Sequence, residues 1–214
     1  KFYEGDTMIP IQDITIRSLS GYVFIVPIIV LYYIFLAKKE REQSLLHIFI
    51  VCIFCYYLFG ILTVTGIGYT STISFRPQIS LIPFVGMITG PIETILNIVL
   101  FVPMGLFLPL LYKKYNKFKT VVITGILFSV SIELVQMLNW GASDINDVMT
   151  NTMGACLGYL IYSIISKILP DKLDRQLKSK KVNAFIEVFL LSVCIFVIMV
   201  TVQPWFVHNV LNIP

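Results

Sequence analysis

The chain has 214 residues, of which 57% are hydrophobic and 13% are charged. About a quarter of the residues in soluble domains are charged, so this composition excludes an ordinary soluble protein and predicts an integral membrane protein. The net charge of +4 would favour a nucleic-acid partner in a soluble protein. We predict no such partner here, because most of the basic residues lie in the connections between apolar segments.

Six apolar stretches are long enough to cross a bilayer as helices, which takes about 20 residues each. They cover residues 21–37, 45–65, 91–112, 120–138, 148–168 and 182–202, and the first can extend back past Arg17. The shorter apolar segment 81–87 contains Pro83 and Gly86 and is predicted to be re-entrant or interfacial. We therefore predict an all-α, polytopic transmembrane helical bundle that forms one membrane domain over residues 1–214.

The basic residues predict how the bundle is oriented. Thirteen of the sixteen follow the first, third and fifth spans: Lys38, Lys39, Arg41, Lys113, Lys114, Lys117, Lys119, Lys167, Lys172, Arg175, Lys178, Lys180 and Lys181. The positive-inside rule places these loops in the cytoplasm and both ends of this chain outside. Trp140 and Trp205 follow outward-running spans, where an aromatic belt is expected. Because the chain begins at Lys1, we expect further residues upstream.

The four cysteines predict no chemistry. Cys52 and Cys55 form a C-x-x-C in an apolar run, without a second pair or a thioredoxin-like βαβ context. Such thiols are interpreted as small buried hydrophobic groups rather than as a metal or redox site.

Polar residues gather at the start of the fifth span. Asp144, Asp147, Asn151, Gly154 and Gly158 are separated by three or four residues, which places them on one face of a helix. The two glycines form a G-x-x-x-G pattern that allows a neighbouring helix to approach closely. The polar half of this face is therefore predicted to face protein rather than lipid.

Two other spans carry polar pairs at a similar depth. Glu133 and Gln136 share a face of the fourth span, and Glu93 and Asn97 share a face of the third. Pro103 is expected to kink or locally open the third span. The sequence therefore predicts one outward-facing polar pocket between these three helices.

Structural alternatives exist for several of these residues. Asp144 fits a helix N-cap, and Glu93 fits the first turn of a helix after Gly90 and Pro91. Asn97 and Asn151 are also suited to hydrogen bonds between helices.

Glu133 has the weakest structural explanation. It lies near the C-terminal end of an apolar helix, where a negative charge opposes the helix dipole. Carboxylates at membrane depth are costly and are usually functional. We predict that Arg76 is its partner.

These residues also resemble a known family. The run SIELVQMLNWGASDINDVMTNTMGACLGYLIY (131–162), with SLIPF (80–84) and NIVLFVPMGLFLPLL (97–111) before it, is similar to the core of VanZ-like membrane proteins. The resemblance covers residues 78–162, with two helices in 1–77 and a basic loop and last helix in 163–214 as flanking parts. Many members have an arginine shortly before the first aspartate, where this chain has Gly141 and Ala142.

The resemblance implies an accessory protein of the bacterial cell membrane that lowers sensitivity to teicoplanin and related lipoglycopeptides. It marks as recurring polar positions Asn97, Glu133, Gln136, Asp144, Asp147 and Asn151. The implied partners are membrane lipid, a lipoglycopeptide or a lipid-linked wall precursor, held at the outward-facing pocket.

Two other functions remain as alternatives. In a membrane enzyme, Glu133 could act as acid or base and Asp144 with Asp147 could hold Mg²⁺ or Ca²⁺, although no H-E-x-x-H, G-x-S-x-G or Walker motif is present and no cofactor is predicted. His47 is interpreted as an interfacial residue rather than a catalyst. In a transporter, the polar residues would form a solute path. Against it, we expect no ionisable residue in the inner halves of the spans before the basic loops.

Overall fold

The computed structural model describes residues 3–4, 7–8, 11–39, 41, 43–67, 79–84, 87–88, 90–137, 143–179 and 182–211. In this part of the chain, six helical segments are long and apolar enough to cross a membrane, which confirms the predicted all-α polytopic bundle. Their helices are α1 (Ile11–Lys38), α2 (Leu45–Val64), α4 (Pro91–Leu111), α5 (Phe118–Gln136), α6 (Ile145–Ile168) and α8 (Ala184–Val200).

The first helix begins well before its predicted start at residue 21. Arg17, the charged residue that delayed the predicted start, is buried, and its Nε lies 3.1 Å from Asp13 Oδ2. This ion pair one helical turn apart supports the helix across the charged positions. The other long helices begin and end within about three residues of the predicted bounds, which is usual for boundaries.

Short elements connect and end the long helices. The 3-10 turn η1 (Lys113–Asn116) precedes α5, α7 (Asp171–Leu177) follows α6, and α9 (Val202–Asn209) follows α8. Strands β1 (Tyr3–Glu4) and β2 (Thr7–Met8) pair antiparallel, and β3 (Ile79–Ser80) pairs in parallel with β4 (Ser143–Asp144).

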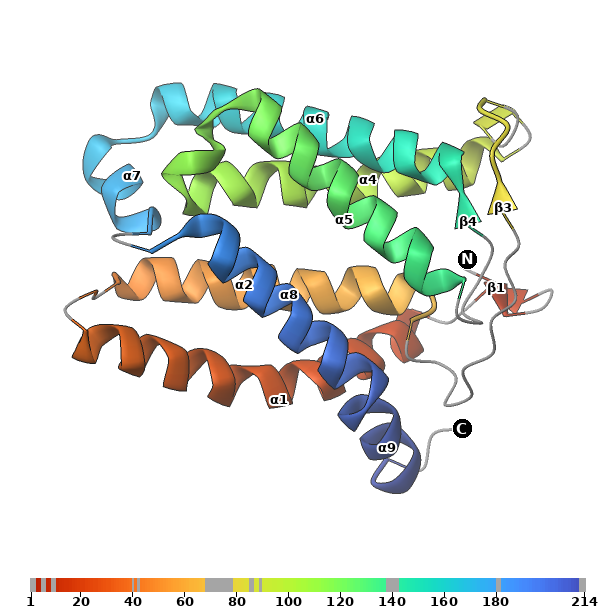
Figure 1. Cartoon of the computed structure of the whole chain (residues 1–214), viewed down its shortest axis with the longest axis horizontal. Coiled ribbons are helices and arrows are strands. Elements are labelled where there is room, and N and C mark those ends of the chain that lie inside the picture. The colour runs from red at the N-terminus through yellow and green to blue at the C-terminus, as the bar shows by residue number, and fades with distance from the viewer. Residues whose placement is uncertain are drawn as a thin grey trace.

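The long helices form two groups. Helices α4, α5 and α6 pack against one another, and α1, α2 and α8 form the second group, with α9 against α1 (Figure 1). The two groups meet mainly where α2 packs on α4. The core is rich in aromatic and branched side chains, including Phe54, Ile61 and Phe101, which are fully buried.

The contact of α4 with α6 depends on glycines. A Cβ atom at Gly154 or Gly158 would overlap the carbonyl oxygens of Ile98 and Val102, and one at Gly105 would overlap the backbone of Ala155. These glycines let the two backbones approach closely, as small residues do between membrane helices. The structure thus confirms the close helix approach that the G-x-x-x-G pattern predicts.

The two ends of the bundle differ in composition. One end carries the connection from α1 to α2, then η1 and α7, where the predicted basic loops lie; we call it the basic end (Figure 1). The other end carries β3 and β4 with the starts of α4 and α6 and the end of α5; we call it the polar end (Figure 1). Which end faces the cytoplasm stays a prediction.

Two local predictions concern prolines. Helix α4 continues as one helix through Pro103, so this proline does not break the span. The hydroxyl of Tyr57 donates to Leu100 O at 2.7 Å, one turn before Pro103. In the segment 81–87, the described residues 81–84 follow β3 and include a turn rather than a spanning helix, and Ile82 is exposed.

Candidate functional site

Asp144 begins α6. Its backbone is extended, with φ −130° and ψ 127°, and its Oδ1 accepts from the Asn146 N–H at 2.9 Å. An aspartate at this position satisfies a helix-end donor and typically contributes about 1 kcal/mol. The structure therefore supports the interpretation of Asp144 as a helix cap.

Glu133 reaches the same point from α5. Its Oε2 accepts from the backbone N–H of Asp144 at 2.9 Å, and its side chain is buried. The carboxylate therefore joins the end of α5 to strand β4. Arg76, its predicted partner, lies outside the described residues, so that pairing stays a prediction.

Asn97 and Asp147 form the link between α4 and α6. Asn97 Nδ2 donates to Asp147 Oδ1 at 2.6 Å, and both side chains are partly buried. A hydrogen bond to a carboxylate is stronger than one between neutral groups.

Asn151 and Gln136 make further links. Asn151 Nδ2 donates to Ser129 Oγ on α5 at 2.9 Å, and Gln136 Nε2 donates to Thr65 O at the end of α2 at 2.8 Å. Within the described part of the chain, the side-chain oxygens of Asn151 and Gln136 are buried without a hydrogen-bond partner. Each of these two amides therefore has a buried oxygen available to accept a hydrogen bond. A buried polar atom without a partner is rare in native proteins and usually has a specific cause.

Asn146 is a residue of this site that the sequence reasoning did not select. Its Oδ1 accepts from the N–H of Phe84 at 2.6 Å, and its Nδ2 donates to Ile82 O at 3.1 Å. The side chain therefore holds the segment after β3 against the start of α6. Phe84 has φ 70°, a strained value for a bulky residue that requires such support.

Glu93 is separate from these bonds. It lies in the first turn of α4, after Gly90 as N-cap and Pro91, and its side chain is exposed. This is the helix-start position that its structural alternative predicts. We define the polar cluster as the remaining residues that meet at the polar end, which are Asn97, Ser129, Glu133, Gln136, Asp144, Asn146, Asp147 and Asn151.

The comparisons with known proteins place this region in a family. A family model described as VanZ/LLP1 matches residues 47–166, which is more than half of the chain. The chain belongs to the VanZ/LLP1 family. The matched region contains α2, α4, α5 and α6, and with them the whole polar cluster.

A curated relative agrees with this assignment. Protein VanZ from Enterococcus faecium is 37% identical over 87 residues, which are 39% of this chain and 52% of that protein. The match thus spans about half of the length of the relative. No solved structure matches the chain.

The polar cluster of this VanZ/LLP1 chain supplies mainly acceptors. Three carboxylates, from Glu133, Asp144 and Asp147, are held by donors on neighbouring elements. Among the described residues, no three His, Cys, Asp or Glu side chains are arranged to hold a metal ion, and a divalent cation stays a prediction. Two cavities lined by described residues lie elsewhere, so a pocket at the polar end also stays a prediction.

Two buried residues nearer the basic end correct the expectation that this part of the spans lacks ionisable side chains. Glu187 of α8 is buried, and its Oε1 accepts from the hydroxyl of Tyr33 on α1 at 2.7 Å. His47 is fully buried within the protein, and its Nδ1 lies 2.6 Å from Leu177 O of α7. The expectation that the inner halves of the spans lack ionisable residues is therefore wrong. Glu187 is a single carboxylate in an apolar run, and its partner Tyr33 lies 154 residues away in sequence, so local spacing does not indicate this pair.

Proposed function

We propose that this VanZ-family membrane protein contributes to tolerance of teicoplanin and related lipoglycopeptides at the bacterial cell envelope. The polar cluster binds a polar part of the drug or of an envelope component on the outer side of the membrane. The observation that supports this most is the Asn97–Asp147 bond at 2.6 Å. Together with the Glu133–Asp144 bond at 2.9 Å, this bond holds carboxylates from different parts of the family-matched region at the polar end.

The chemistry of the polar cluster suits such ligands. Lipoglycopeptides carry basic groups and amides as well as an acyl chain, and carboxylates with amide side chains complement basic and amide groups. The carboxylates are positioned in advance by hydrogen bonds to neighbouring elements, which lowers the ordering cost of binding. Leu81, Ile82 and Phe84, which are exposed beside the polar cluster, would contact acyl chains at the same membrane depth.

The orientation needed for this function follows from the basic loops. In the sequence, thirteen of the sixteen basic residues fall in or next to the segments that follow α1, α4 and α6, and the positive-inside rule favours a cytoplasmic position for those segments. The polar cluster is at the opposite end and would then face the cell exterior, where the drug and its wall targets are found.

Drug susceptibility tests this proposal. A susceptible Gram-positive strain is made to express wild-type protein, Asp147→Asn or Glu133→Gln, and the minimal inhibitory concentration of teicoplanin is measured. Both substitutions remove a charge but retain an oxygen that can accept the observed bond. The expected result is loss of protection to the level of the empty vector, at unchanged membrane abundance measured by immunoblot.

A matched control makes the same change at the other end. Asp171 is exposed at the start of α7, so Asp171→Asn removes one carboxylate far from the polar cluster. This variant is expected to protect like wild type. If Asp147→Asn and Glu133→Gln also protect like wild type, the charges of the polar cluster are not required and the proposal fails.

A further inference from the structure

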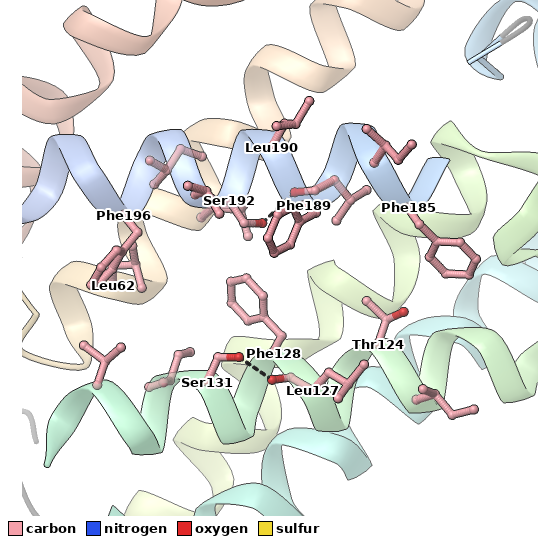
Figure 2. Close-up of a pocket in the computed structure, with 18 of the residues that line it drawn as sticks. Leu62, Thr124, Leu127, Phe128, Ser131, Phe185, Phe189, Leu190, Ser192 and Phe196 are labelled. Atoms are coloured by element: carbon pink, nitrogen blue, oxygen red, sulfur yellow. Dashed lines mark hydrogen bonds between the residues drawn. The ribbon is translucent and has the colours of Figure 1, made fainter. Parts of the chain in front are cut away.

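A long apolar groove separates α5 from α8. It has a volume of about 920 Å³ and is lined by side chains of both helices, with Leu58 and Leu62 of α2 behind them. Figure 2 shows Phe128 of α5 and Phe189 of α8 pointing toward one another across the gap. The groove remains open because α5 packs on α4 and α6, whereas α8 packs on α1 and α2.

The groove walls suit a hydrocarbon chain. Leu127 and Phe189 are 62% and 66% exposed, so the two sides are not closed by protein. The two serine hydroxyls that line the groove are satisfied on their own helices: Ser131 donates to Leu127 O at 2.7 Å, and Ser192 donates to Val188 O at 2.8 Å. Satisfied hydroxyls add little polarity, so the groove favours an apolar occupant.

The length of the groove is also informative. Its lining on α5 runs from Thr120 to Val135, which at 1.5 Å per residue is about 22 Å. The hydrocarbon core of a bilayer is about 30 Å thick. The occupant is therefore a long chain that lies along the helices.

A second cavity adjoins the groove at the basic end. It has a volume of about 500 Å³, and its lining includes Lys113, Lys114 and Asn183. The two cavities share no lining residue, but Phe185, which lines the groove, directly follows Ala184, which lines the second cavity. Lys114 Nζ lies 4.5 Å from the centre of the Phe185 ring, which places a positive charge at the mouth of the groove.

The second cavity suits an anion. Lys113 and Lys114 are exposed on η1, so their ammonium groups are available to a ligand at the membrane surface. The start of α8, with Asn183 as its cap, adds a partial positive charge. Basic side chains at this depth attract anionic lipid headgroups.

We propose that an anionic phospholipid binds at this place, with its phosphate beside Lys113 and Lys114 and one acyl chain in the groove between α5 and α8. The two neighbouring cavities fit the two halves of such a molecule. The cationic cavity suits the headgroup, and the apolar groove, which runs along the helices, suits an acyl chain. This site is distinct from the polar cluster and does not depend on the function proposed for that cluster.

Lipid retention measured by native mass spectrometry tests the site. Full-length protein in a non-ionic detergent is titrated with phosphatidylglycerol or with phosphatidylcholine of the same acyl chains. Wild type is expected to retain one phosphatidylglycerol in preference to phosphatidylcholine. Lys113→Gln with Lys114→Gln is expected to weaken phosphatidylglycerol binding roughly tenfold, since each lysine near the surface contributes to the attraction.

Two matched controls distinguish binding at this site from effects of net charge and of added side-chain bulk. Lys117→Gln with Lys119→Gln removes the same charge from the same connection, outside the lining of the pocket, and is expected to bind like wild type. Val193→Trp fills the groove, whereas Val197→Trp changes an exposed residue of the same helix outside the lining. Only Val193→Trp is expected to lose both lipids, at an unchanged melting temperature.

Several results would overturn the proposal. Equal retention of the two lipids by wild type shows that no headgroup site exists. An equal loss with the 117/119 pair shows diffuse attraction rather than a pocket. Retention unchanged in Val193→Trp shows that the chain does not lie in the groove. Full competition by inorganic phosphate at the concentration of the lipid identifies a site for soluble phosphate instead.

Discussion

Asn97 Nδ2 donates to Asp147 Oδ1 at 2.6 Å, and this bond joins α4 to α6 at the polar end of the bundle. The same two helices are in close backbone contact farther along, at Gly154 and Gly158. The bond therefore fixes the register of two helices that the glycines bring together, and it orients one carboxylate of the polar cluster.

A double-mutant cycle measures this bond. Asn97→Ala and Asp147→Ala are each expected to lower the free energy of unfolding by about 1–2 kcal/mol, and the double variant by less than the sum of the two. The coupling energy is expected to be about 1 kcal/mol in detergent, measured by reversible chemical unfolding. Additive single effects would show that the two side chains do not interact in the folded protein.

The glycines predict that the same substitution, Gly→Ala, changes stability very differently at two positions. Gly158→Ala places a methyl group on the carbonyl oxygen of Val102, so it is expected to lower stability by more than about 2 kcal/mol. Gly60→Ala is the control, because a Cβ atom there has nothing within 4 Å. That change is expected to be neutral or to stabilise α2 by up to about 1 kcal/mol through helix propensity. Similar melting temperatures for the two variants would contradict the close packing of α4 and α6.

The buried carboxylate of Glu187 depends on Tyr33. Tyr33→Phe removes the donor at 2.7 Å and leaves Glu187 Oε1 without that bond, so a loss of about 1–3 kcal/mol in stability is expected. Glu187→Gln keeps an acceptor for the same hydroxyl and is expected to lower stability less than Tyr33→Phe does. Thermal unfolding of both variants in the same detergent checks the order, and a Tyr33→Phe variant as stable as wild type would contradict it.

Lys178 predicts a dependence of stability on alkaline pH. Burial lowers the pKa of Lys178, but its bonds to Asp174 and to the hydroxyl of Tyr162 raise it by more, so its pKa lies above the ordinary 10.5. The stabilisation is therefore fully present below the ordinary pKa and is lost as the pH rises through the raised value. As the pH rises from the ordinary pKa of 10.5 toward the raised value, wild type is expected to lose more stability than Lys178→Met.

Lys172→Met is the matched control for this pH effect. Lys172 is exposed on the same short helix, so its removal is expected to leave the alkaline slope of the melting temperature unchanged. A Lys178→Met slope equal to that of wild type would show that this ammonium does not stabilise α7 against α6.

Much of the fold could be predicted from the sequence because lipid-facing helices are long and apolar. The spans after the first follow directly from runs of apolar residues. The start of α1 was harder to predict, because Asp13 and Arg17 lower the apolarity of its first turns. Their ion pair at 3.1 Å offsets that polarity, but only the folded helix shows it.

The site could be predicted in part. The spacing of polar residues on three spans selected Asn97 with Asp147 and Glu133 with Asp144, which hydrogen bonds join at the polar end, and their role in binding stays a prediction. The same spacing also selected Glu93, which is exposed and separate from these bonds. It did not select Asn146, because helical spacing from Asp144 excluded it from the chosen face. Its role depends on the segment after β3, which contacts it from 62 residues away.

The proposed function requires the polar end to face the exterior, and cysteine labelling in intact cells tests this most directly. In a variant without the four native cysteines, Ile79→Cys on exposed β3 marks the polar end, and Lys172→Cys on α7 marks the basic end. A membrane-impermeant maleimide is expected to label Ile79→Cys in intact cells and Lys172→Cys only after permeabilisation. Labelling of Lys172→Cys in intact cells, with Ile79→Cys protected until the membrane is opened, would contradict the account.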